Sequence, residues 1–295
     1  MGKSNMKIVY IASMLIFGSI GLFVRRLPIP SLHIAFLRSL IGTFVLILIY
    51  TVMGKKIDRR AIQENRYYLI LAGAFLGINW ILLFEAYKRT TITSATLAYY
   101  MAPVIFILLS ALVFRLRITG VRALTISLSF AGLCILLMKD LTTYGNMKGE
   151  GIAFGLLAAF FYALVIILNR KMKKVSGLDR TLMELMVSLL ILGVYMLLTG
   201  EFQRFQVPLY ALPYAVILGV VHTGLAYYLY FSTVDKLDSQ HVALFSYIDP
   251  LSAMLFSAAF LKETIYFNMA MGALLILGSS VLFDLIGKKE QRRSS

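Results

Sequence analysis

The chain has 295 residues, of which 60% are hydrophobic and 15% are charged, and its mean hydropathy is +0.82. Such an apolar composition excludes a soluble enzyme or a soluble binding protein. The net charge of +15 does not indicate nucleic-acid binding, because the basic residues lie in short gaps between apolar runs and do not form one polar, basic surface.

Apolar runs recur along the whole chain, and each is close to the roughly 20 residues that a helix needs to cross a bilayer. We therefore predict an all-α polytopic membrane protein of ten transmembrane helices. The predicted spans, in chain order, are residues 7–24, 31–52, 67–87, 93–114, 121–138, 150–169, 180–199, 213–234, 241–261 and 268–287. The connections are short, so the function must lie within the helix bundle.

The basic residues concentrate in alternate connections. The connections 53–66 and 170–180 are the richest in Lys and Arg, and the C-terminal tail after residue 287 is also basic. An even number of spans separates these segments, so all three lie on one side of the membrane. The positive-inside rule predicts a multi-pass cell-membrane protein with both termini in the cytoplasm.

An internal repeat relates the two halves of the sequence. A shift of 147 positions aligns Trp80 with Tyr227, Tyr100 with Tyr247 and Pro103 with Pro250. We predict two five-helix repeats, residues 7–138 and 150–287. Because five is odd, the copies cross the membrane in opposite senses, and such inverted repeats are typical of secondary transporters with a midplane site between the halves.

Several short motifs carry a resemblance to a known family. They are Phe17-Gly18-Ser19, Arg38, the stretch 84–87, the stretch 95–103, and the second copy from Ala243 through Asp249-Pro250 to Leu261-Lys262-Glu263-Thr264. In these features the chain resembles the EamA-type, ten-helix drug/metabolite transporter superfamily over about residues 8–286. The family usually ends its fourth span with a glutamate, but Leu116 stands where Glu263 stands in the second half. The resemblance implies an exporter of amino acids and related compounds that is often proton-linked.

Asp249 is the charged residue nearest the middle of a predicted span, where a charge costs about 2.5–3.5 kcal/mol on insertion scales. One reading is a carboxylate that faces the central cavity and takes part in substrate binding or proton coupling, with Ser246 on the same helix face. The other is a capping residue at a helix restart, with Pro250 at the first helical position. The two readings are compatible.

Arg38 and Glu85 have similar predicted depths in the second and third spans. We predict a structural ion pair between them; the alternative is that Glu85 binds a substrate amine and Arg38 binds a carboxylate. Glu184 follows Arg180 by one helical turn, which predicts an interfacial pair. His222, in the eighth span, either bonds to a neighbouring helix or relays protons to Asp249.

Aromatic and amide side chains are candidates for a substrate cavity, although membrane-core packing explains many aromatic residues. Such a cavity suits amphipathic metabolites. The predicted substrate-binding residues are Asn79, Trp80, Glu85, Tyr99, Tyr100, Tyr227, Ser246, Tyr247 and Asp249. Pro103 and Pro250 remove intrahelical hydrogen bonds at equivalent positions and are candidate hinges.

The sequence lacks the P-loop, HExxH, GxSxG and CxxC patterns, and its single cysteine, Cys134, lies in an apolar run. We expect no cofactor, no metal and no enzymatic activity. The main prediction is a secondary transporter of small metabolites in the lipid bilayer, a monomer or homodimer with possible proton coupling and no nucleic-acid partner. The alternatives are a transporter of organic cations or quaternary amines, a membrane enzyme that uses Glu85, Asp249 and His222, or a non-transporting scaffold.

Overall fold

The computed structural model describes residues 3–114, 120–144, 146–237 and 239–294, and all their regular elements are helices. Leu116 lies outside the described residues. The first half contains α1 (Lys3–Gly18), α2 (Ile20–Arg25), α3 (Ser31–Val52), α4 (Arg59–Glu64), α5 (Arg66–Arg89), α6 (Ile92–Tyr99), α7 (Ala102–Val113) and α8 (Gly120–Tyr144). The second half contains α9 (Asn146–Lys171), α10 (Gly177–Leu198), η1 (Leu209–Ala211), α11 (Leu212–Gly219), η2 (Val220–Leu225), α12 (Ala226–Thr233), η3 (Val234–Lys236), α13 (Ser239–Ser246), α14 (Ile248–Leu261) and α15 (Phe267–Ser294).

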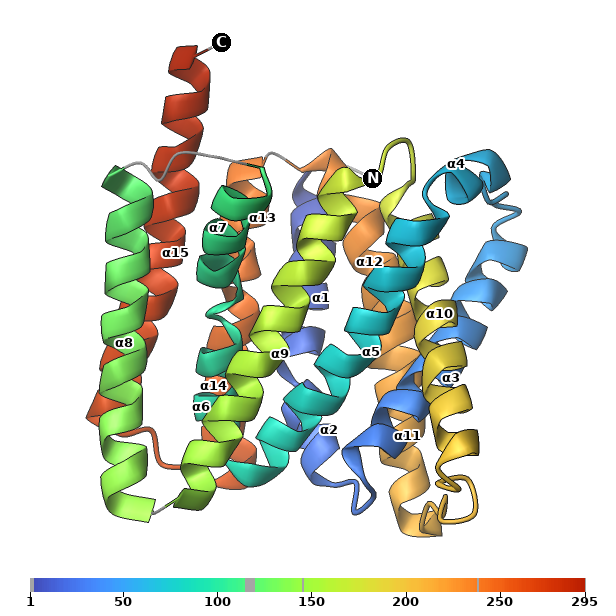
Figure 1. The fold of residues 1–295 in the computed structure, drawn as a ribbon, viewed down its shortest axis with the longest axis horizontal. Coiled ribbons are helices and arrows are strands. Elements are labelled where there is room, and N and C mark those ends of the chain that lie inside the picture. Colours follow the sequence, from blue (N-terminus) through green and yellow to red (C-terminus); the bar gives the residue numbers. More distant parts are fainter. Residues whose placement is uncertain (1–2, 115–119, 145, 238, 295) are drawn as a thin grey trace.

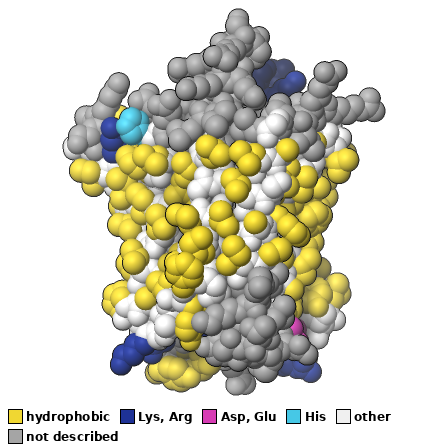
Figure 2. Space-filling view, turned by 90° about the vertical axis from the view of Figure 1, so that its left-hand side faces the viewer, with side chains coloured by type: hydrophobic (Ala, Val, Ile, Leu, Met, Phe, Trp, Pro, Cys, Tyr) yellow, Lys and Arg dark blue, Asp and Glu magenta, His cyan; other side chains and the backbone are white. Residues whose placement is uncertain are grey.

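Eight helical stretches in the described part of the chain are long and apolar enough to cross a membrane, and two shorter apolar stretches lie in α8 and α15. The eight stretches are Asn5–Arg25, Ser31–Val52, Arg66–Arg89, Ile92–Val113, Gly149–Lys171, Gly177–Leu198, Leu209–Thr233 and Leu244–Leu261. Nine of these ten stretches match the predicted spans to within a few residues, and the described apolar stretch of α15, Phe267–Ser279, covers the first part of the predicted span 268–287. Figure 2 shows the matching surface, in which hydrophobic side chains cover the middle and Lys and Arg lie at the ends.

Both termini lie at the same end of the bundle (Figure 1). We call this end, which also carries the 172–176 connection, the terminus face, and the other end the opposite face. α1 starts at the terminus face, whereas α9, the first helix of the second half, starts at the opposite face. The halves therefore run in opposite directions.

The packing between helices follows the same symmetry. α5 packs along α9, and its counterpart α12 packs along α1; α6 and α7 pack on α9, and their counterparts α13 and α14 pack on α1. α3 pairs with α10, and α8 pairs with α15 (Figure 1). The α5–α9 and α1–α12 contacts each join one half of the chain to the other, so the interface between the halves is formed by equivalent helices of both.

The fourth and ninth spans are each broken near the middle. α6 ends at Tyr99 and α7 begins at Ala102, whereas α13 ends at Ser246 and α14 begins at Ile248. Pro103 and Pro250 lie in the first turn of the second segment in each case, where a missing backbone N–H costs little. The predicted kinks are thus helix breaks, and they occupy equivalent places in the two halves.

Candidate functional site

Two adjoining chambers lie between the halves. The first, the deep chamber, has a volume of about 290 Å³, and the second, the vestibule, has a volume of about 440 Å³. Both are lined by Phe17, Leu76, Tyr100, Tyr162, Tyr227, Ser246 and Asp249. The deep chamber adds mainly Arg38, Asn79, Trp80, Tyr87, Tyr99 and Pro103, and the vestibule adds mainly Tyr10, Asn169, Arg170, Arg180, Glu184 and Tyr230.

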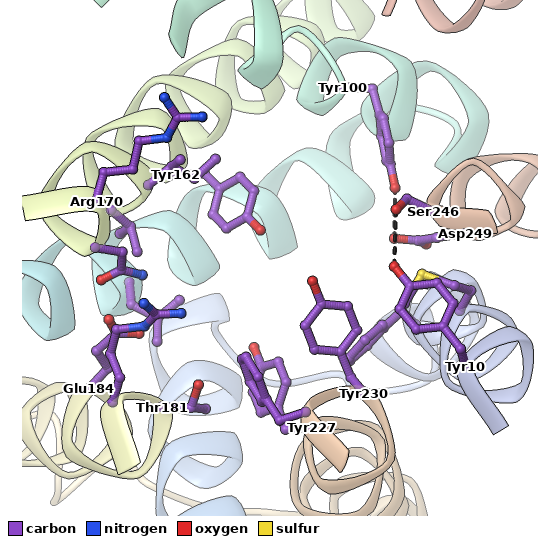
Figure 3. Close-up of a pocket in the computed structure, with 18 residues that line it drawn as sticks. Tyr10, Tyr100, Tyr162, Arg170, Thr181, Glu184, Tyr227, Tyr230, Ser246 and Asp249 are labelled. Carbon is purple, nitrogen blue, oxygen red and sulfur yellow. Dashed lines mark hydrogen bonds between the residues drawn. The ribbon is translucent and has the colours of Figure 1, made fainter. Parts of the chain in front are cut away.

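The vestibule extends toward the terminus face. Its wall includes Arg170 and Arg180, which flank the 172–176 connection at that end. In Figure 3, Arg170, Glu184 and Thr181 lie on one side of the vestibule and Asp249 with Tyr100 on the other. The cavity therefore runs from the terminus face to the helix breaks.

Asp249 lies where the two broken spans meet. Its Oδ2 accepts a hydrogen bond of 2.8 Å from the Tyr100 hydroxyl, so a residue of the first break holds a residue of the second. The N-cap of α14 is Tyr247, and Asp249 lies inside the first turn. The carboxylate thus faces the cavity, and the capping role proposed from the Asp-Pro sequence is not the one that the side chain performs here.

Arg38 is the buried cation of the deep chamber. The residue is only 3% exposed; its Nε donates to Thr223 Oγ1 at 2.8 Å and its Nη2 donates to the His222 carbonyl at 3.5 Å. Its guanidinium carbon lies 4.1 Å from the centre of the Trp80 ring, in cation–π geometry. Among the described ion pairs, none joins Arg38 to a carboxylate.

A π-helical turn supplies both polar partners of Arg38. Residues Val220–Leu225 form η2, and the Thr223 hydroxyl also donates to the Leu218 carbonyl at 3.0 Å. A π-bulge shifts the register of the helix and often occurs at functional sites. Here it directs a hydroxyl and a carbonyl at one guanidinium.

The predicted ion pair between Arg38 and Glu85 does not form in this structure. Glu85 accepts from the Ser31 hydroxyl and from Arg89, both at 2.7 Å, near the opposite face. Arg38 lies seven residues beyond Ser31 in α3, which is about 10 Å along a helix axis. The two helices are neighbours, as expected, but Ser31 is the residue at the depth of Glu85.

His222 and Tyr247 are not among the residues that line the two chambers. His222 Nε2 is 2.8 Å from Ser19 Oγ, and Nδ1 is 3.2 Å from the Ile217 carbonyl, so its contacts are with neighbouring helices rather than with Asp249. Tyr247 packs against an apolar cluster that includes Met254 and is absent from both sets of lining residues. The placement of Glu85, His222 and Tyr247 therefore does not support their predicted roles in the cavity.

The remaining predicted substrate-binding residues do come together. Asn79, Trp80, Tyr99, Tyr100, Tyr227, Ser246 and Asp249 all line one or both chambers. The Asn79 amide donates to the Ala158 carbonyl at 2.7 Å, a contact between α5 and α9 that fixes its place in the wall.

Other lining residues were not among the predicted binding residues. They include Tyr10, Tyr162, Asn169, Thr181, Glu184 and Tyr230. Tyr230 shares the helix face of Tyr227, and Glu184 is charged within an apolar run, so both carried a signal in the sequence. Tyr10 and Tyr162 cannot be distinguished from other membrane aromatic residues in the sequence. Only the structure shows that the first helix of each half, which carries them, lies beside the cavity.

Polar contacts close the opposite face. Arg25 Nη2 lies 3.3 Å from Glu263 Oε1, and the Arg25 side chain also donates to the carbonyls of Tyr87 and Thr90. The Glu263 carboxylate accepts from the Ile92 backbone N–H at 3.0 Å, at the positive end of α6. We call these groups the opposite-face gate. Neither Arg25 nor Glu263 lines either chamber, whereas Arg170 and Arg180, near the terminus face, line the vestibule.

Comparisons with known proteins agree with the architecture. The sequence profile of the EamA-like transporter family matches residues 6–138 and 149–283. The chain is 27% identical over 259 residues to the uncharacterized transporter YxxF of Bacillus subtilis, covering 88% of this chain and 82% of that protein. It is also 27% identical over 275 residues to an uncharacterized transporter of Archaeoglobus fulgidus, covering 92% and 93%. A solved structure described as a crystal structure of a protein has a similar fold, with a TM-score of 0.64 at 18% identity over 97% of this chain and all of that one.

Proposed function

Because the chain belongs to the EamA-like transporter family, we propose that this multi-pass membrane transporter is a secondary active exporter of small amphipathic metabolites bearing both a carboxylate and an ammonium group. Amino acids and related compounds have this chemistry. One observation carries the proposal: Arg38 is buried in the deep chamber without a carboxylate partner among the described residues.

A buried guanidinium without a counter-ion has lost its hydration and gains little in return, at a cost of several kcal/mol. Thr223 and the His222 carbonyl satisfy part of its hydrogen-bonding capacity but carry no formal charge. A substrate carboxylate would supply that charge and could accept two parallel N–H bonds from the guanidinium. In this proposal Arg38 binds the acidic group of the substrate.

A second charged group of the same chamber suits a cation or a proton. Asp249 contributes a carboxylate, and Trp80, Tyr99 and Tyr227 contribute aromatic surface to the same chamber. Carboxylates within membrane spans typically pair with a cation or take part in proton transfer. We assign Asp249 to the substrate ammonium group and to proton exchange.

The closed opposite face corresponds to one state of an alternating-access cycle. If the terminus face is cytoplasmic, as the distribution of Lys and Arg predicts, then this state is open toward the cytoplasm. The proposed hinges are the two broken spans, which have Pro103 and Pro250 beside their breaks. The halves rock about these hinges to open the opposite-face gate and close the vestibule.

Three compounds with one phenyl group and different charges test the proposal: phenylalanine, phenethylamine and 3-phenylpropionate. Purified protein is expected to bind phenylalanine most tightly in a thermal-shift titration and to move it across liposome membranes under an imposed pH gradient. Arg38→Gln should abolish the preference for phenylalanine over phenethylamine by removing the partner of the carboxylate. Arg38→Lys, which keeps the charge but loses the bidentate geometry, should keep part of it.

Three other results would contradict the proposal in different ways. Transport of phenethylamine or a quaternary amine without transport of phenylalanine would support an organic-cation carrier. Hydrolysis of an ester or amide probe by the purified chain would support the enzyme alternative. Folded protein that moves no solute of a broad amino-acid and amine panel would support a scaffold.

A further inference from the structure

Glu184 of α10 lies in the wall of the vestibule, although its position near a helix end first indicated an interfacial pair. The residue is only 4% exposed, and its Oε1 has no hydrogen-bond partner. Figure 3 shows it across the vestibule from Asp249. A buried carboxylate oxygen without a donor costs free energy that a bound donor would recover.

The nearest groups leave this site rich in acceptors. Asn169 of α9 lines the same vestibule, and its Oδ1 also has no hydrogen-bond donor. Arg180 precedes Glu184 by one turn and lines the same vestibule, yet the described ion pairs do not join the two side chains. Two oxygen acceptors from different helices therefore adjoin the vestibule without protein donors.

The backbone around Glu184 is fixed by close helix packing. A Cβ atom added at Gly73 of α5 would lie 2.7 Å from the Glu184 carbonyl oxygen and 2.6 Å from Val187 Cβ. Only a glycine permits this approach of α5 to α10. The backbone that carries the carboxylate is thus held at a set place in the wall, as a binding residue requires.

We propose that Glu184 and Asn169 form an ammonium-binding subsite in the vestibule. This inference rests on the proposed transport function and names a second recognition point on the same path. A primary ammonium group carries three N–H donors, which suit a carboxylate and an amide oxygen together. The aromatic side chains of Tyr227 and Tyr230 lie in the same wall and suit the apolar part of the molecule.

The subsite should distinguish ammonium groups that have N–H donors from those that do not. The probes are hexylammonium and hexyltrimethylammonium, which have the same chain and charge. They are titrated calorimetrically into the purified full-length chain at about pH 8, where an alkylamine is protonated. Each titration is repeated in the Asp249→Asn variant so that the deep carboxylate does not contribute.

We expect Glu184→Gln to weaken hexylammonium binding at least about tenfold and to change hexyltrimethylammonium binding far less, because the quaternary probe donates no hydrogen bond. Asn169→Leu should weaken hexylammonium binding several-fold from the other helix, and it tests the subsite independently if Glu184→Gln does not fold. Glu64→Gln is the matched control, since Glu64 is half exposed in an ion pair with Arg60 and lies outside the vestibule.

Unchanged hexylammonium affinity in folded Glu184→Gln or in folded Asn169→Leu would overturn the subsite. This failure differs from that of the transport proposal. If the wild-type chain moves phenylalanine but Glu184→Gln binds hexylammonium as tightly as the wild type does, the subsite is wrong and the transport proposal stands. If amine binding depends on Glu184 but no solute is moved, the subsite stands and the transport proposal is wrong.

Discussion

The hydroxyl of Tyr100 donates a hydrogen bond of 2.8 Å to Asp249 Oδ2, and this bond joins the break in the fourth span to the break in the ninth. Tyr100→Phe leaves the carboxylate without this donor, so the apo protein should lose about 1–3 kcal/mol of stability. Asp249→Asn keeps an oxygen that accepts from Tyr100, so its melting temperature should change little while its flux no longer responds to an imposed pH gradient.

The two variants therefore separate stability from coupling. Tyr195→Phe serves as the control for tyrosine replacement, because Tyr195 is 54% exposed on the outer surface of α10. Full pH-driven flux by Asp249→Asn would contradict the role of Asp249 in proton coupling.

Thr223 positions Arg38 by accepting from its Nε at 2.8 Å. Thr223→Val should weaken phenylalanine binding about threefold to tenfold, because the guanidinium loses one of the groups that orients it. Thr223→Ser keeps the hydroxyl and should bind nearly as well as wild type. The chain has a single tryptophan, Trp80, stacked on Arg38, so its intrinsic fluorescence measures the binding directly. Equal affinities for the Val and Ser variants would contradict this role.

The opposite-face gate should set the balance between the closed and open states of that face. Arg25→Gln and Glu263→Gln each weaken a charge-assisted contact, and each should raise the open population several-fold. Leu83 lines the deep chamber, so a Leu83→Cys probe in a Cys134→Ser background reports opening through its reaction with a maleimide applied from the opposite face.

The effects of the two gate variants should not add when combined, since they remove the same contact. Glu64→Gln, which alters the exposed Arg60–Glu64 pair at the terminus face, should leave the reaction rate unchanged. A rate that rises equally in this control would indicate a general loosening of the fold rather than a gate.

Gly18 allows the first span to approach α14. A Cβ atom at this position would lie 1.9 Å from Ser252 Oγ and 2.5 Å from the Asp249 carbonyl oxygen. Gly18→Ala should destabilise the protein by about 1–3 kcal/mol, measured by thermal unfolding in detergent. Adding Ser252→Ala should restore only part of the loss, because the backbone carbonyl remains. Gly278→Ala is the control, since nothing lies within 4 Å of a Cβ added there.

Much of the fold follows from the sequence because the bilayer constrains helix length and the repeat constrains helix order. The predicted second span, 31–52, coincides with α3, and the offset between Pro103 and Pro250 locates both helix breaks. Asp249 was identified because a charge in the middle of a membrane span is unusual. The aromatic residues of the fourth and eighth spans were identified with the help of the repeat, which aligns aromatic positions of the two halves.

The incorrect contact predictions arise where the position of a residue along its helix is not enough to identify its partner. Arg38 and Glu85 were paired by their approximate positions in two spans, but Ser31 lies beside Glu85, and the π-helical turn gives Arg38 other partners. Glu184 was paired with Arg180 because it follows Arg180 by four positions, although its side chain lines the vestibule. Which face of a membrane helix points inward depends on its neighbours, and spacing within one helix does not encode that.

The opposite-face gate relies on main-chain atoms as much as on side chains. Arg25 donates to the carbonyls of Tyr87 and Thr90, and Glu263 accepts from the N–H of Ile92. No replacement of the Tyr87 or Thr90 side chain deletes the carbonyl that takes part, and at Ile92 only proline removes the backbone N–H. A genetic screen for leaky variants would therefore recover Arg25 and Glu263 readily, overlook Tyr87 and Thr90, and detect Ile92 only as proline, whereas a backbone amide-to-ester substitution at Ile92 would test that contact without changing the side chain.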